Sequence, residues 1–243
     1  MPFHRKLWIA SAFLTVFLLA GCSLAEDITP PPNYRPPTQA PEQPAADEVA
    51  FPQTPPDPAQ GEAIYAEKCL PCHGESGLGD GPQAGNLPNP AAPIGSPDLA
   101  RQARPVDWYR IVTVGNLDKF MPGFSQGLTD SQRWDVVAYT YSLSVSPAEL
   151  EQGQTLYNQN CADCHGETGQ GDGSQAASLP AQPAAWNQDL ESLAQLSADD
   201  MAQLMTGGVE GHPDFSDELD ESERYSVAAY ARTLSFASPV DPV

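Results

Sequence analysis

The chain has 243 residues, enough for one or two ordinary domains, and a formal net charge of −21 at pH 7. Such an acidic chain is a poor partner for nucleic acid or anionic lipid, and its field favours partners that present a basic docking patch. The plainer interpretation is an acidic surface that keeps an exported protein soluble. After residue 148 the only basic side chains are Arg224 and Arg232, so the charge is concentrated in the second half.

Residues 1–21 have the features of an export signal. A positive start, HRK at 4–6, precedes the apolar run at 7–20, which is too short for a comfortable membrane span. The run ends in Leu-Ala-Gly-Cys, which resembles the lipobox of bacterial lipoproteins and implies that Cys22 is acylated. We therefore expect a lipid anchor at Cys22 that holds the protein on a bacterial membrane, facing the periplasm or the extracellular side. An ordinary signal with a coincidental cysteine is the alternative.

Residues 22–56 are a predicted spacer. Proline, alanine and glutamine dominate from Pro30 onward, larger apolar residues are few, and no hydrophobic period is present. Such a stretch buries too little apolar surface to offset the entropy of ordering. We expect a disordered tether that lets a carrier visit more than one partner, although a passive stalk has the same composition.

The rest of the chain contains two copies of one unit. Residues 60–84 match 152–176 without a gap at an offset of 92, and residues 121–139 match 212–230 at an offset of 91. The repeat predicts two small domains, each near the size at which a protein core alone is marginal. The short connection between them predicts packed neighbours.

Helix signals frame both units. Asp57 before a proline predicts a helix start, and Thr129 with Gln132 predicts a capping box before the last helix of the first unit. Asp220 with Glu223 does the same in the second unit. No strand pattern appears, so the predicted fold class is all-α.

Four of the five cysteines form two Cys-x-x-Cys pairs that run directly into histidine, CLPCH at 69–73 and CADCH at 161–165. This is the attachment signature of c-type haem, because the two thiols reach the two vinyl groups and the next residue places an imidazole under the iron. We expect two covalently bound haem c groups, held by these residues: Cys69 and Cys72, and Cys161 and Cys164. A zinc site would need a second pair of ligands, and a thioredoxin-like dithiol a βαβ surrounding. Neither is present, and a disulfide within each pair is the third alternative.

Each repeat resembles a class I cytochrome c domain, and the pair is similar to the bacterial dihaem cytochromes c built from two such domains. The resemblance covers residues 57–145 and 149–236, the expected first and second cytochrome c domains. In that family the first and last helices cross where a glycine contacts an aromatic residue. The matching pairs here are Gly61 with Tyr139 and Gly153 with Tyr230.

The resemblance also implies the iron ligands. His73 and His165 would be the proximal ligands of the two haems. Met121, in a Met-Pro loop before the last helix, would be the distal ligand of the first haem. His212 stands in the place of Met121 in the second repeat and is followed by the same proline. We therefore expect His212 to be the distal ligand of the second haem.

A methionine is the main rival of His212, and an open iron comes after it. Met205 is the candidate, since it lies with Met201 in the short helix before the loop. The ungapped match aligns these two methionines with Tyr109 and Thr113, which favours packing roles for both.

Unequal ligands predict unequal haems. A thioether ligand raises the reduction potential, whereas a second imidazole stabilises ferric iron and lowers it. We expect a high-potential first haem, a lower-potential second haem and internal electron flow from the second to the first. The expected function is electron shuttling between redox proteins of a respiratory chain, without a catalytic residue, a small-molecule substrate or nucleic acid. The alternatives are a dihaem peroxidase-like enzyme and an electron-entry subunit of a larger oxidase or dehydrogenase.

Overall fold

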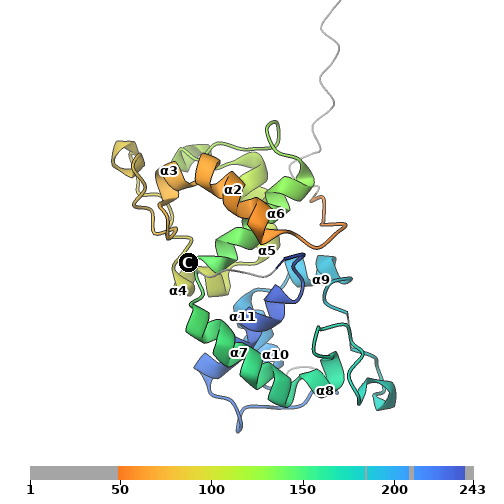
Figure 1. Ribbon diagram of the computed structural model, residues 1–243. Helices are drawn as coiled ribbons and strands as arrows, with labels where there is room; N and C mark the ends of the chain where they lie inside the picture. Colours follow the sequence, from red (N-terminus) through yellow and green to blue (C-terminus); the bar gives the residue numbers. More distant parts are fainter. Residues whose placement is uncertain (1–48, 184, 208–210, 239–243) are drawn as a thin grey trace, which may run out of the picture. The chain divides into compact units, whose positions relative to one another are not determined.

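The computed structural model describes residues 49–183, 185–207 and 211–238 (Figure 1). The expected signal at 1–21, its Cys22 and the expected tether up to residue 48 lie outside these ranges. The described part consists of helices and loops with two isolated bridges and no strand, which confirms the all-α class. None of its helices is both long and apolar enough to cross a membrane.

The two repeats fold as two helical domains whose α-helices follow the same order, and η2 of the first domain has no counterpart among the described residues of the second. The first contains α2 (Pro58–Lys68), α3 (Leu70–His73), η1 (Ala84–Asn86), α4 (Pro97–Gln102), α5 (Pro105–Val114), η2 (Leu117–Lys119) and α6 (Asp130–Ser142). The second contains α7 (Pro147–Asn160), α8 (Ala162–His165), η3 (Ala176–Ser178), α9 (Leu190–Ala194), α10 (Ala198–Leu204) and α11 (Glu221–Thr233).

The predicted caps start these helices. The Asp57 side chain accepts a hydrogen bond from the backbone of α2, where proline occupies the first position. Thr129 and Gln132 form a full capping box at α6. Asp220 and Glu223 form the same box at α11, so each last helix begins where the sequence predicts.

In each domain the first and last helices cross closely, α2 on α6 and α7 on α11 (Figure 1). A Cβ atom built on Gly61 would stand 2.0 Å from the Asp135 carbonyl oxygen and 2.9 Å from Tyr139 Cβ. A Cβ atom on Gly153 would stand 2.0 Å from the Ser226 carbonyl oxygen. The predicted glycine crossing is therefore present twice, and only a residue without a side chain fits it.

The two domains are packed against each other through arginine side chains. Only residues 143–146 separate α6 from α7, as the short connection predicted. Arg101 of α4 donates to Glu149 at 3.1 Å and lies 4.2 Å from the centre of the Tyr225 ring. Arg232 of α11 is 6% exposed and lies 5.2 Å from the centre of the Tyr141 ring. These contacts connect the two domains by one ion pair and two cation–π interactions.

Arg232 is buried without a carboxylate close enough to form an ion pair among the described residues. Its guanidinium donates to the carbonyl oxygens of Leu196 at 2.6 Å and Leu193 at 3.3 Å instead. Burial lowers the pKa of Arg232. The backbone carbonyls therefore replace the water that this charge has lost.

Residues 49–57 form a packed segment that starts earlier than the expected first domain. Trp134 Nε1 donates to the Ala50 carbonyl at 2.7 Å, and Val49 and Phe51 pack against the same apolar cluster. At the other end, Asp57 accepts from Ser238, and the Ala237 backbone donates to the Pro56 carbonyl. The last part of the expected 22–56 tether is thus held on both domains, because its few apolar side chains find partners there.

Alanine at Gly61 tests the helix crossing. We expect Gly61→Ala to lower the free energy of unfolding of the holoprotein by about 2 kcal/mol or more, because overpacking a tight contact costs roughly 1–3 kcal/mol. Gly85→Ala is the control, since no atom lies within 4 Å of its added Cβ. Chemical denaturation followed by far-ultraviolet circular dichroism measures both. Equal stability of the two variants would show that the crossing is not tight.

Candidate haem-iron centres

Each Cys-x-x-Cys-His motif folds into a single helical turn. The backbone of His73 donates to the Cys69 carbonyl at 2.9 Å, and that of His165 donates to the Cys161 carbonyl at 2.8 Å. The two thiols and the imidazole of each motif therefore leave the same short helix, α3 or α8. All four cysteines are free and half-buried.

A buried tyrosine ties each motif to the first helix of its domain. The Tyr65 hydroxyl donates to the Gly74 carbonyl and the Tyr157 hydroxyl donates to the Gly166 carbonyl, both at 2.7 Å. Gly74 and Gly166 follow the motif histidines and have φ angles of 81° and 80°, which favour glycine. The motif and its anchor are therefore the same in both domains.

The surroundings of the first cysteine in each motif are apolar. Burial raises the pKa of Cys69 and of Cys161 to about 12, and the second thiol of each motif adds to the effect. Both thiols are therefore uncharged at neutral pH. An uncharged sulfur in an apolar setting fits a thioether bond to a porphyrin vinyl group.

His73 is prepared to bind a metal through its outer nitrogen. Its Nδ1 lies 3.1 Å from the Ala92 carbonyl oxygen, and because a carbonyl only accepts, Nδ1 carries the proton. The free Nε2 can then act as a ligand, and the bond to Ala92 fixes the ring and raises its basicity. Burial lowers the pKa of His73, which favours the neutral form that binds iron.

His165 stands in the same place in the second domain but has a different neighbour. Its Nδ1 is buried and has no hydrogen-bond partner within the described ranges. Its ring centre lies 5.0 Å from that of Trp186. Burial lowers the pKa of His165, and the nearby His212 adds to this.

Met121 lies in a short loop closed by the backbone. Asn116 and Met121 exchange two backbone hydrogen bonds of 2.8 and 3.0 Å, and Phe124 donates to the Val112 carbonyl at 2.9 Å. Phe120, just before Met121, adopts a left-handed conformation with φ of 59°. The loop therefore presents a half-buried thioether beside the end of α5.

His212 lies in the corresponding loop of the second domain. Phe215 donates to the Met205 carbonyl at 2.8 Å, which repeats the bond made by Phe124. The Nδ1 of His212 lies 3.0 Å from the Pro213 carbonyl oxygen, so this nitrogen carries the proton and Nε2 is free.

The two imidazoles of the second domain come close enough to share one metal ion. The ring centres of His165 and His212 are 6.3 Å apart. Two imidazoles on opposite sides of one ion have metal–nitrogen bonds of about 2 Å, and each ring centre lies about 1 Å behind its nitrogen, which gives about 6 Å. The pair therefore fits a six-coordinate haem iron.

Met201 and Met205, the rivals of His212, belong to the core of the second domain. They are 8% and 7% exposed and pack in one apolar cluster with Tyr157. Arg232 also donates to the Met201 sulfur at 3.2 Å. Both methionines therefore have packing partners in the structure.

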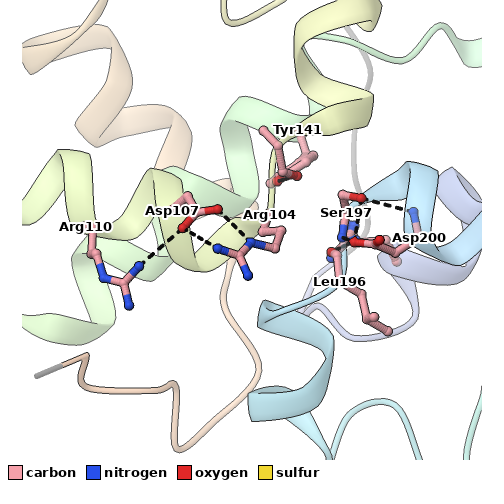
Figure 2. A network of polar contacts seen from close by, with 9 residues as sticks. Arg104, Asp107, Arg110, Tyr141, Leu196, Ser197 and Asp200 are labelled. Carbon is pink, nitrogen blue, oxygen red and sulfur yellow. Dashed lines mark hydrogen bonds and ion pairs between the residues drawn. The ribbon is translucent and has the colours of Figure 1, made fainter. Parts of the chain in front are cut away.

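The alignment of these methionines with the first domain differs from the ungapped match. Arg104 precedes α5 and Ser197 precedes α10, as Figure 2 shows at the starts of the two helices. Met205 lies eight residues after Ser197, as Val112 lies eight after Arg104. The carbonyl of Met205 accepts from Phe215 and that of Val112 accepts from Phe124, so Met205 corresponds to Val112 and not to Thr113. The loops on either side of α10 differ in length from those around α5, and these differences shift the register.

The caps of the two short helices also differ (Figure 2). Arg104 donates two hydrogen bonds to Asp107, at 2.7 and 3.0 Å, whereas Ser197 and Asp200 form a capping box. The hydrogen bonds from Ser197 hold the pKa of Asp200 below its usual value. The same helix thus begins with different side chains in the two domains.

Four apolar side chains in and beside the Met121 loop are exposed to solvent. Ile111, Val114, Leu117 and Phe120 are 40%, 50%, 79% and 62% exposed. A porphyrin is a large apolar body that needs such surface to cover. These side chains therefore fit a haem beside α5 and the loop.

The sequence alone did not indicate Ala92 or Trp186. Ala92 contributes only a backbone carbonyl, which no side-chain pattern reveals. Trp186 corresponds to Gly95, since both backbones donate to a glycine carbonyl in the loop after the motif, at 2.8 and 3.0 Å. A gapped alignment of the two repeats would have shown a tryptophan in the place of a glycine.

Comparison with known proteins identifies the family of the two repeats. The model of the family "Cytochrome C oxidase, cbb3-type, subunit III" matches residues 56–139 and 148–230. The subunit CcoP of a cbb3-type cytochrome c oxidase from Azospirillum brasilense is 28% identical over 201 residues, 72% of this chain and 61% of that protein. The subunit FixPc from Rhizobium leguminosarum bv. viciae is 32% identical over 119 residues, 46% of this chain and 40% of that protein. The chain thus matches about three-fifths of the length of the first relative and less of the second.

A solved structure, the reducing HAO-like protein complex of Kuenenia stuttgartiensis, is 24% identical with a TM-score of 0.32. The match covers 76% of this chain and 99% of that chain. A likeness at this score carries no argument about function.

Proposed function

The chain belongs to the family of subunit III of cbb3-type cytochrome c oxidase, and from this membership we propose that it is an electron-transfer protein. It contains two tandem cytochrome c domains that bind two haem c groups covalently. Each haem supplies one iron that changes between the ferric and ferrous states. The protein supplies the axial ligands of the iron, excludes water from the haem and thereby sets its reduction potential.

We assign one ligand set to each haem. The first set is Cys69, Cys72, His73 and Met121, and the second is Cys161, Cys164, His165 and His212. The observation that supports the second set is the 6.3 Å separation of the His165 and His212 rings, and the first set rests on the place of Met121 in the corresponding loop. The burial of Met205 in the core supports His212 over its main rival.

This assignment makes the two haems unequal. The Met121 sulfur favours ferrous iron and raises the potential of the first haem, whereas the His212 imidazole favours ferric iron and lowers that of the second. Electrons then pass from the second haem to the first. The packed arrangement of the domains, held by Arg101 and Arg232, supports transfer within one molecule.

An exchange of the distal ligands tests the assignment. Met121→His is expected to lower the potential of the first haem and leave that of the second unchanged, and His212→Met is expected to raise that of the second alone. The potentials change because the sulfur or nitrogen atom bound to the iron changes, and the identity of the axial ligand moves haem potentials over a range of about 0.8 V. Spectroelectrochemical titration of each holoprotein measures the effect. A His212→Met variant with wild-type potentials would show that another residue binds the second iron.

The surface of the second domain supports a basic redox partner. Arg232 is buried and Arg224 is half-buried, and these are the only lysine or arginine side chains after residue 148, so this domain presents mainly acidic charge. An acidic surface steers a partner with basic residues toward its redox centre. We propose that the electron donor docks here and that the first domain delivers the electron.

An electron-entry subunit of a larger oxidase is the second candidate function. The relatives are named as subunits of cbb3-type cytochrome c oxidases, and this chain shares their haem domains. A subunit would remain bound to its oxidase, whereas a shuttle would bind and leave.

Purification from membranes in mild detergent separates the two candidates. A shuttle that docks by charge is expected to bring an oxidase with it at low ionic strength and to lose it at about 0.5 M salt, where screening acts within a few ångströms. A permanent subunit keeps the oxidase at both ionic strengths. Haem-stained gels and oxidase spectra read the outcome, and the absence of any oxidase at low ionic strength would contradict both candidates.

The membrane anchor is a proposal from the sequence. Cys22 follows a signal that resembles a lipobox, and the described residues contain no helix that could span a membrane. A diacylated cysteine would hold the haem domains on the membrane surface through the residues between Cys22 and the first domain.

Replacement of the lipidated cysteine tests the anchor. In the Cys22→Ser variant we expect haem to move from the membrane fraction to the soluble exported fraction, because the acyl chains supply the binding energy. Haem spectra of the two fractions measure the shift, and Cys22→Ser should leave both haem potentials unchanged. Retention of the variant in membranes washed with high salt would rule out a lipid anchor as the main attachment.

A further inference from the structure

We infer that Trp186 is a positioning residue of the second haem centre, which holds the proximal His165 ring by packing, while no described residue accepts a hydrogen bond from the His165 Nδ1. The inference rests on the proposed function, because it takes His165 as a ligand of the second haem. It goes further by naming a residue that sets how far apart the two potentials lie.

Trp186 takes a position where the first domain cannot carry a side chain. Gly95 occupies that position there, and a Cβ atom added to it would stand 1.9 Å from the Ser76 carbonyl oxygen. In the second domain the loop leaves room for an indole, whose ring centre lies 5.0 Å from His165 and 5.6 Å from Tyr157. Trp186 therefore joins the proximal ligand to the tyrosine that anchors the haem motif.

The two proximal histidines are consequently held by different means. His73 is oriented by its Nδ1 bond to the Ala92 carbonyl at 3.1 Å. The Nδ1 of His165 is buried and finds no acceptor in the described part of the chain. The tilted indole beside it, at 35°, restricts the ring by contact alone.

This difference has an electronic consequence. A ligating histidine that donates its other N–H to a carbonyl becomes more basic, which stabilises ferric iron and lowers the potential. His165 makes no such hydrogen bond to any described residue, so its Nε2 should donate electron density to the iron more weakly than that of His73. Trp186 therefore raises the potential of the second haem and partly offsets the lowering caused by His212.

Removal of the indole is expected to lower the potential of the second haem. In Trp186→Gly, water reaches Nδ1 and accepts a hydrogen bond from its N–H, and the ferric-to-ferrous ratio of the second haem at a fixed potential should rise about tenfold, as expected for a change in the hydrogen bonding of a ligating histidine. A tenfold change is about 59 mV for one electron. Trp186→Phe keeps a ring against His165 and should stay within about twofold of the wild type.

Trp108→Phe is the matched control. Trp108 stacks on Tyr141 with ring centres 4.7 Å apart and does not contact a proximal histidine. The Trp108→Phe variant also replaces an indole by a smaller ring, but it should leave the potential of the second haem unchanged. If Trp186→Gly does not retain haem, Trp186→Leu keeps apolar volume without a ring and should shift the potential in the same direction.

The outcomes separate this inference from the proposed ligand set. If the wild-type second haem shows the electron paramagnetic resonance signal of two histidines and the potential of the folded Gly or Leu variant stays unchanged, Trp186 only fills space and the inference is wrong. If the wild-type protein lacks that signal, the proposed ligand set fails whatever the variants do. A lower potential in the Gly or Leu variant with a wild-type potential in Trp186→Phe supports the inference.

Discussion

In each domain a hydrogen bond from a buried tyrosine connects the haem motif to the first helix of the fold. The hydroxyl of a fully buried tyrosine, Tyr65 or Tyr157, donates to the carbonyl of the glycine that follows the motif. The same tyrosines pack against Tyr139 and Tyr230 on the last helix, with ring centres 5.2 and 5.4 Å apart. The helix crossing and the single-turn motif are thereby joined. Because this unit is the same twice, differences between the haems must come from residues outside it.

In the proposed ligand sets, those differences lie on both sides of each iron. On the distal side the proposed thioether ligand Met121 is replaced by the imidazole of His212. On the proximal side His73 is bonded to the Ala92 carbonyl, whereas His165 lies against the indole of Trp186 and has no acceptor among the described residues. The two replacements act in opposite directions on the second haem, since an added imidazole lowers the potential and a lost hydrogen bond raises it. With these proposed ligands, two copies of one helical unit would hold two unlike redox centres.

Much of the fold could be predicted because its signals are local. The caps at Thr129 and Asp220 and the glycines of the helix crossing depend on neighbours or on one repeated spacing. The packing of residues 49–57 could not be predicted in this way, because Val49 and Phe51 find partners such as Trp134, far along the chain. The sequence aligned α10 with α5 one residue away from the alignment that the structure shows. The loops before and after α10 differ in length from those around α5 in opposite directions, so an ungapped match hides both differences.

The most direct test of unequal haems is a redox titration of the wild-type holoprotein, followed by electron paramagnetic resonance and near-infrared spectra. The account predicts two one-electron midpoints. The higher midpoint should belong to the haem with the near-infrared band of a methionine ligand, and the lower to the haem with the signal of two histidines. A single shared midpoint, or the methionine band on both haems, would contradict it.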